Sequence, residues 1–248
     1  MSVGGWADRY RQGDRERVWS ELGRLGSNVR DPSVLTEAQA VCDEMALRVR
    51  FNIELLVNRL QSQEYVFHSN DDARTPVVPF QPASVRASQF AAWLEERFGP
   101  VPLVLSSWIR LVGDVWLVGT HPGWGESSAA DPLVIELEGT RYSGESISSY
   151  FISEHEAWAE EARDDPAVGS FVLPVAPDRL HKANVSGGAP FGFRVPDGGA
   201  DGVFAAENDM SFVSYLNLIF RNGGFACWPL GDRHERLRKS LTDGLLLL

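Results

Sequence analysis

An unbroken apolar stripe limits what the first third of this chain can fold into. Apolar side chains recur at steps of three and four residues between positions 36 and 60, with no proline or glycine among them. Thr36 and Gln39 also have the spacing of a helix-capping box. The pattern predicts one helix over residues 36–60, about 38 Å long, whose stripe is buried in a core or in a seam with another helix. The stripe consists of Ala38, Val41, Cys42, Met45, Val49, Ile53, Leu56, Val57 and Leu60.

The rest of the chain mixes short strand patterns with helical ones. Turn residues and alternating apolar positions separate the segments, and Ser211 has the place of a helix N-cap. We therefore predict an α+β fold, in which helices surround a mixed or mainly antiparallel sheet and a helical N-terminal region precedes it. The predicted strands are residues 115–118, 132–137, 171–175 and 191–195, and the predicted helices include residues 88–98, 143–163 and 211–220.

A composition change suggests where the chain divides. Residues 1–68 are mainly helical in pattern, whereas residues 69–76 are polar and are followed by Pro79 and Pro82. We predict a helical region over 1–68, a linker over 69–87 and an α+β domain over 88–248.

The charge of the chain is acidic and unevenly distributed. The formal net charge is −11, and residues 1–64 carry 9 basic against 10 acidic side chains, which leaves −10 for the remainder. A surface of this sign repels phosphate backbones, so we expect no nucleic-acid binding. The same charge either keeps the protein soluble or attracts a basic partner.

Nothing in the sequence indicates export or membrane insertion. The N-terminus has no apolar segment of signal-peptide type, and no apolar run approaches the length of a bilayer span. Cys42 and Cys227 have no C-x-x-C partners, which argues against a zinc ribbon or a thioredoxin-like site. We expect a cytoplasmic protein without a structural disulfide.

The familiar catalytic motifs are absent from the sequence. It contains no G-x-S-x-G elbow, Walker A loop, H-E-x-x-H pair or G-x-G-x-x-G fingerprint, and its five histidines are scattered. We therefore predict no catalytic residues, no metal and no cofactor.

Two glycine-rich loops are the candidate sites for a small ligand. Residues 119–128 contain His121 and Trp124, and Asp131 follows, so a histidine and a carboxylate are available for acid–base chemistry. Residues 181–190 contain His181, Lys182 and Ser186, and successive backbone N–H groups around Ser-Gly-Gly can form an anion-binding nest. The competing interpretation of both loops is a turn between two strands.

A concentration of acid in one predicted helix is the candidate surface for a partner. Six carboxylates are opposed there by Arg163 alone, and the competing interpretation is that they only solvate the helix. They are Glu154, Glu156, Glu160, Glu161, Asp164 and Asp165.

The segment 93–103, continuing to Trp108 and Gly113, resembles the opening of the SUKH superfamily. That superfamily includes yeast cell-wall-assembly regulators and bacterial immunity proteins. Its members show a helix with Glu, then Gly, then Leu-Pro, then a second helix; here Val101 stands in place of the leucine. Residues 212–224 are similar to a late helix of the family. The chain also resembles bacterial proteins of unknown function over 181–188 and 222–225.

The resemblance implies an α+β protein-binding domain and supplies no catalytic residues. In immunity-type members an acidic face holds a toxin, so the first hypothesis is a non-enzymatic module that binds a basic protein. The second is a small-ligand binder or hydrolase-type enzyme that uses the loops around His121 and His181. The third is a regulatory protein that forms a homodimer through its long helix.

Overall fold

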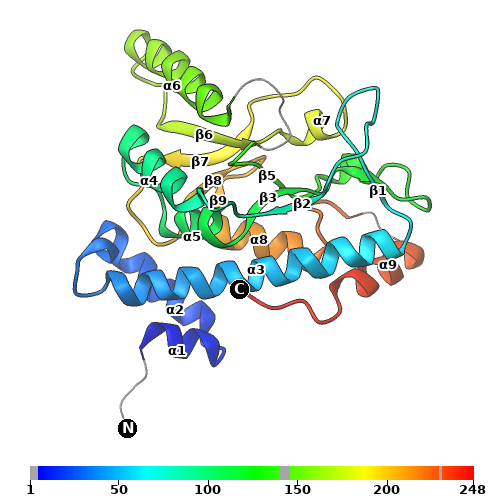
Figure 1. Cartoon of the computed structure of the whole chain (residues 1–248), viewed down its shortest axis with the longest axis horizontal. Helices are drawn as coiled ribbons and strands as arrows, with labels where there is room; N and C mark the ends of the chain where they lie inside the picture. The colour runs from blue at the N-terminus through cyan, green and yellow to red at the C-terminus, as the bar shows by residue number, and fades with distance from the viewer. Residues whose placement is uncertain (1–4, 140–145, 229–230) are drawn as a thin grey trace.

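The computed structural model describes residues 5–139, 146–228 and 231–248. Helices dominate the first third, and shorter ones are interleaved with strands in the remainder (Figure 1). Their bounds are α1 Trp6–Arg11, α2 Arg15–Leu25, α3 Leu35–Ser62, α4 Ala87–Phe98, α5 Leu103–Leu111, α6 Ile147–Asp164, α7 Arg179–Lys182, α8 Phe212–Arg221 and α9 Asp232–Thr242, with 3-10 turns η1 Gly26–Arg30 and η2 Ser127–Ala130.

The strands are short and form antiparallel pairs, which confirms the predicted α+β class with its helical N-terminal region. They form small sheets of order β1-β4, β2-β3-β5 and β6-β7-β8-β9. The Glu136 N–H donates to the Val175 carbonyl over 2.7 Å and so links the second sheet to the third. Their bounds are β1 Val66–Phe67, β2 Phe80–Pro82, β3 Gly113–Trp116, β4 Gly119–Thr120, β5 Val134–Ile135, β6 Phe171–Ala176, β7 Phe191–Val195, β8 Val203–Ala205 and β9 Met210–Ser211.

The long helix predicted over residues 36–60 is confirmed as α3, and its stripe from Ala38 to Leu60 is largely buried. The predicted capping box is wrong. The helix begins one residue earlier, at Leu35, because the Asp31 carbonyl accepts from the N–H groups of both Val34 and Leu35 and starts the first turn. The Gln39 amide, instead of reaching back to the cap, donates to Asp43 and to Ser107 of α5.

Helix α3 lies beneath the strands, with α1 and α2 on its far side (Figure 1). The chain's final residues bond to α3 at Asn52. Buried Asn52 donates to the Leu246 carbonyl over 2.9 Å and accepts from the Leu246 N–H over 2.7 Å. This two-way contact satisfies both ends of a buried amide, whose desolvation would otherwise be unfavourable. Leu248 is buried beyond it.

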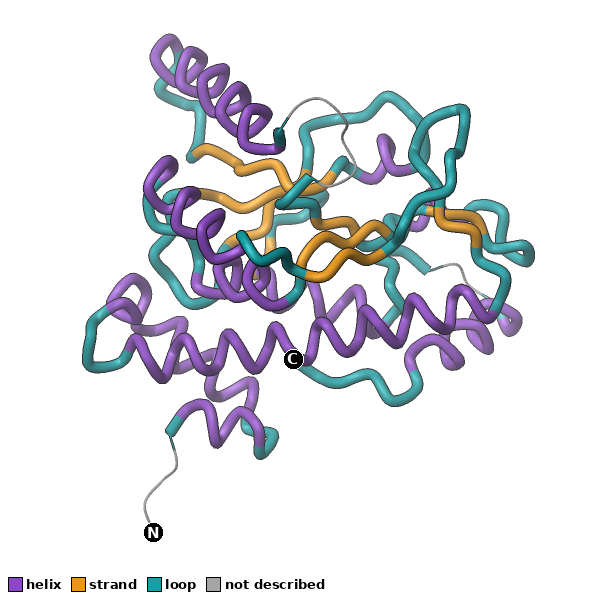
Figure 2. The backbone as a smooth tube through the Cα atoms, in the orientation of Figure 1, coloured by secondary structure: helices purple, strands orange, loops and turns teal. Residues whose placement is uncertain are grey.

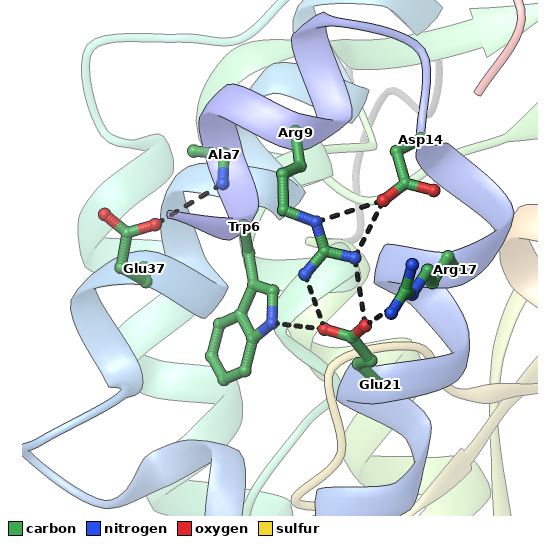
Figure 3. A network of polar contacts seen from close by, with 7 residues as sticks. All are labelled: Trp6, Ala7, Arg9, Asp14, Arg17, Glu21 and Glu37. Atoms are coloured by element: carbon green, nitrogen blue, oxygen red, sulfur yellow. Dashed lines mark hydrogen bonds and ion pairs between the residues drawn. The ribbon is translucent and has the colours of Figure 1, made fainter. Parts of the chain in front are cut away.

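An arginine-centred network joins α1 to α2 (Figure 3). The Arg9 guanidinium donates to both Glu21 oxygens, at 2.7 and 2.9 Å, and to Asp14 at 2.8 and 3.0 Å. The Trp6 indole N–H donates to Glu21 over 2.9 Å. These hydrogen bonds, with that from Arg9 first, lower the pKa of Glu21 to about 2. The network joins two short helices that are also in contact through the rings of Tyr10 and Trp19.

The segment predicted as a linker, residues 69–87, contains β2, which pairs with β3 at Phe80 and Val115. Just before it, β1 pairs with β4. Residues on both sides of this segment contribute to one hydrophobic core, which runs from Ala7 through α3 and the strands to Leu248.

Helix α6 lies at the edge of the molecule farthest from α1 (Figures 1 and 2). The Ser146 side chain caps its start by accepting from the Ser149 N–H. Phe151 is its only buried residue, and the Trp158 indole fastens its second half by donating to the Gly169 carbonyl over 2.9 Å. The helix therefore rests on β6 by one face and leaves the other face to solvent.

Candidate functional site

The two glycine-rich loops meet at a buried ion pair. The Lys182 ammonium lies 2.5 Å from Asp131 Oδ1, and the two side chains are 0% and 6% exposed. Asp131 ends η2 in a left-handed backbone conformation, at φ 54°, and Lys182 ends α7. The structure thus brings together two of the six predicted ligand residues, one from each loop.

The surroundings of Lys182 are apolar on its other side. Its ammonium stands 4.9 Å from the centre of the Phe191 ring, a cation–π contact. Burial lowers the pKa of Lys182, and the Asp131 carboxylate opposes that effect. A lysine so enclosed neutralises a buried carboxylate and fixes one loop against the other, and neither charged group is presented to solvent.

Cys227 lies close to this pair but is not an activated nucleophile. Its thiol pKa is raised, first by burial and then by the Asp131 and Glu207 carboxylates. A raised pKa reduces the thiolate fraction at neutral pH, which is the opposite of what nucleophilic catalysis needs.

His121 and Trp124 serve their own loop. The His121 N–H donates to Ser127 Oγ over 3.0 Å, and His121 Nδ1 accepts from the Gly123 N–H over 2.9 Å. Trp124 is 8% exposed and packs against Phe225 and Trp228. Hydrogen bonds among the described residues hold His121 in its turn rather than joining it to Asp131 or His181.

His181 is held by a residue that the sequence analysis did not single out. Asp178 caps α7: its Oδ1 accepts from the Leu180 N–H over 2.7 Å, and its Oδ2 contacts His181 Nδ1. The chain therefore places a carboxylate of its own beside the histidine. The signal for Asp178 was local, since an aspartate directly before a short helix is a preferred N-cap. Ser186, in the same loop, is exposed.

The predicted partner surface lies on α6. Glu156, Glu160, Glu161 and Asp164 are exposed on it with Asp165 at its C-cap, and Glu154 is half-buried. Their ion pairs are loose: Arg97 approaches Glu156 to 3.8 Å and Arg163 approaches Glu160 to 3.9 Å, both at the surface. Such ion pairs contribute little to stability. Most of this negative charge therefore produces a negative electrostatic potential at the surface of α6.

The buried face of α6 is aromatic. The His155 ring contacts Phe98 of α4 and Phe171 of β6, and the Trp158 ring contacts both His155 and Phe171. Burial lowers the pKa of His155, so at neutral pH the imidazole is mainly uncharged and adds no cation beneath the carboxylates.

Comparisons with protein-family models, with curated protein sequences and with solved structures give no match to this chain. The resemblance to the SUKH superfamily therefore stays a prediction.

Two structural properties bound the chemistry of the described residues. In residues 5–139, 146–228 and 231–248, no three His, Cys, Asp or Glu side chains gather closely enough to hold a metal ion. In the same ranges, no helix combines the length and the apolar character that crossing a bilayer requires.

Proposed function

We propose that this chain is a non-enzymatic protein-binding module that holds a basic partner on the exposed carboxylates of α6. The observation that carries the proposal is an 18-residue helix with one buried residue and six carboxylates at or near its outer face. A field of one sign on a projecting surface accelerates encounter with a protein of the opposite sign.

The proposal extends to the type and the place of the protein. A regulator or immunity-type role follows from the SUKH resemblance, and a cytoplasmic location is part of the same proposal. The third hypothesis placed a second copy of the chain on the stripe of α3. Helix α3 packs mainly against α1 and α5 of the same chain, so the proposal assigns the stripe no partner.

The small-ligand and hydrolase alternative has less support. Its two charged candidates, Lys182 and Asp131, form an ion pair with each other in the protein interior. The imidazoles of His121 and His181 form hydrogen bonds within their own loops.

The test compares three baits in extracts of cells that make the protein. The first is the wild-type chain, the second carries Glu156→Lys, Glu160→Lys and Glu161→Lys, and the third is a matched control. The control reverses Glu16, Glu64 and Asp243, three exposed carboxylates outside α6, and so has the same net charge.

We expect a basic protein that the wild type and the control capture and the α6 variant loses. With that protein purified, the α6 variant should associate about tenfold more slowly or worse, and added salt should slow the wild type. If capture and on-rate are the same for all three baits, the carboxylates of α6 serve solubility and the proposal fails.

A further inference from the structure

The outer face of α3, opposite its buried stripe, carries two large apolar residues. Leu47 and Phe51 lie one turn apart on this face and are 52% and 47% exposed, whereas Met45 and Val49 on the opposite side of the helix are fully buried. Adjacent apolar side chains that remain exposed on a rigid element are typical of interaction surfaces. We call Leu47 and Phe51 the α3 ridge.

A groove of about 350 Å³ opens on the same face of α3, nearer its C-terminal end. Glu54, Asn58 and Gln61 line the groove and continue from the α3 ridge at steps of three and four residues. Residues at these steps share one side of a helix. The ridge and the groove therefore face the same way.

The walls of the groove are apolar. Val57 lies on the α3 side, and Val78, Pro79 and Phe80, where the chain enters β2, form the opposite wall. Val78 is 60% exposed. The groove can therefore receive an apolar side chain from another molecule.

The ridge and the groove are placed symmetrically about the middle of α3. Leu47 is five residues before position 52 and Val57 is five residues after it, which is about 7.5 Å along the helix axis in each direction. A twofold axis at position 52 runs one α3 antiparallel to the other, so each Leu47 meets the partner's groove at Val57. The two Phe51 rings then lie next to the axis, and every contact occurs twice, as in an isologous dimer.

The charges on this face suit the same arrangement. Arg50 and Glu54 form an exposed ion pair of 2.9 Å within one chain, and they stand two residues before and two residues after position 52. In the antiparallel arrangement, Arg50 of each copy faces Glu54 of the other. Helix α3 has four acidic and three basic side chains, a net charge of −1 in a chain of −11, so two copies repel each other little along it.

We propose that this protein forms a twofold homodimer in which two α3 helices pack antiparallel by their outer faces, with Leu47 of each copy in the groove of the other. The contact is small, so it belongs with weak interfaces, at a Kd of about 10–100 µM. Below about 1 µM the chain is then mainly a monomer, and unfolding measured there reports on the single chain. Helix α6 lies across the strands from α3 (Figure 1), so the dimer leaves the partner surface of each copy uncovered.

The test measures the mass of the full chain by sedimentation velocity between about 1 and 300 µM. We expect a monomer at the lowest concentration and a dimer at the highest. Leu47→Glu should raise the dimer Kd about tenfold or more, because it places a charge in an apolar groove. Val185→Glu is the matched control: Val185 is also 52% exposed, lies outside α3, and gives the same change in net charge, so the dimer Kd should not change.

Charge reversal tests the antiparallel register. Arg50→Glu should weaken the dimer because it opposes two carboxylates across the axis, and Glu54→Arg should weaken it although that change lowers the net negative charge of the chain. The double variant with Arg50→Glu and Glu54→Arg restores opposite charges at every contact, so its Kd should return toward that of the wild type. Circular dichroism of each variant at about 1 µM shows whether the monomer remains folded.

Three results would overturn the proposal: a monomer at every concentration, a dimer that Leu47→Glu leaves as tight as the wild type, or a double variant no tighter than the two single reversals. Leu47, Arg50 and Glu54 are all exposed or half-buried, so the variants are compatible with folding. The reversals also decide the register if Leu47→Glu should fail to fold.

Discussion

Lys182 shows how a side chain that attracts functional interest can be structural. Its ammonium and the Asp131 carboxylate are both withdrawn from water. Removing one member of such a pair leaves the other charged and unpaired in the interior, which costs more than the pair itself contributes.

We expect Lys182→Met to lower the free energy of unfolding by about 3–5 kcal/mol, measured by urea denaturation. Adding Asp131→Asn, which removes the orphaned charge and suits the left-handed backbone there, should restore part of that loss. Lys239→Met, at an exposed lysine of α9, should change stability by less than about 0.5 kcal/mol. A double variant no more stable than Lys182→Met would contradict this account of the pair.

Asp201 makes stability depend on pH. Burial raises its pKa to about 6, against hydrogen bonds from Ser211 and from the Val213 N–H that lower it. The folded protein therefore holds this proton more tightly than the unfolded chain, so the contribution of Asp201 is greatest below pH 4 and is lost as the pH rises to about 6.

We expect Asp201→Asn to remove this loss, which amounts to about 2 kcal/mol after allowance for solvent screening. Urea denaturation of both proteins at pH 4, 5, 6 and 7 measures it: the stability difference between variant and wild type should shift in favour of the variant along this series. A difference that stays constant with pH would show that Asp201 does not titrate in this range.

At the scale of single residues, sequence reasoning found the participants of the buried centre and missed their pairing. Asp131 and Lys182 are 51 positions apart, and no local pattern specifies which long-range partner a charged side chain will meet. Asp131 was expected to take part in acid–base chemistry and Lys182 to lie beside an anion-binding nest; the fold instead turns these two side chains toward each other.

At the scale of elements, periodicity predicted α3 well because twenty-odd residues contribute to the same signal. The prediction of the capping box failed because a cap depends on a few hydrogen bonds, and other partners can compete for the same side chains. Gln39 finds Ser107, 68 positions away, and that contact has no trace in the local sequence. Ser211 caps α8 as predicted, because its side chain accepts from the Ser214 N–H only three residues away.

The stripe of α3 can be tested with its own exposed neighbours as controls. Met45 and Ile53 are fully buried, whereas Leu47 on the same helix is 52% exposed. We expect Met45→Ala and Ile53→Ala each to lower the free energy of unfolding by about 2–4 kcal/mol, because each leaves a cavity in packed core. Leu47→Ala should cost less than about 0.5 kcal/mol, by the same denaturation measurement. Similar losses at all three sites would show that burial along α3 does not decide its contribution.

At the scale of the whole molecule, the α+β class could be predicted because each strand and helix carries its own pattern. The association of the first third with the rest could not. It depends on pairings such as β1 with β4 and on the contact of Asn52 with Leu246, 194 positions apart. Composition identified the polar segment after residue 68. Composition alone does not distinguish a linker between two domains from a loop within one domain.

Because α6 buries so little of its surface, its local free energy of opening is expected to be lower than the free energy of unfolding of the whole molecule. With Phe151 as its one buried residue, this helix can open and reclose while α3 and the strands stay folded, much as a cooperative unit of low protection does in amide exchange. A melting curve measures the unfolding of the core and does not detect local opening of α6. A substitution that loosens only α6 would therefore leave the melting temperature intact and still change how long the acidic face persists in one shape.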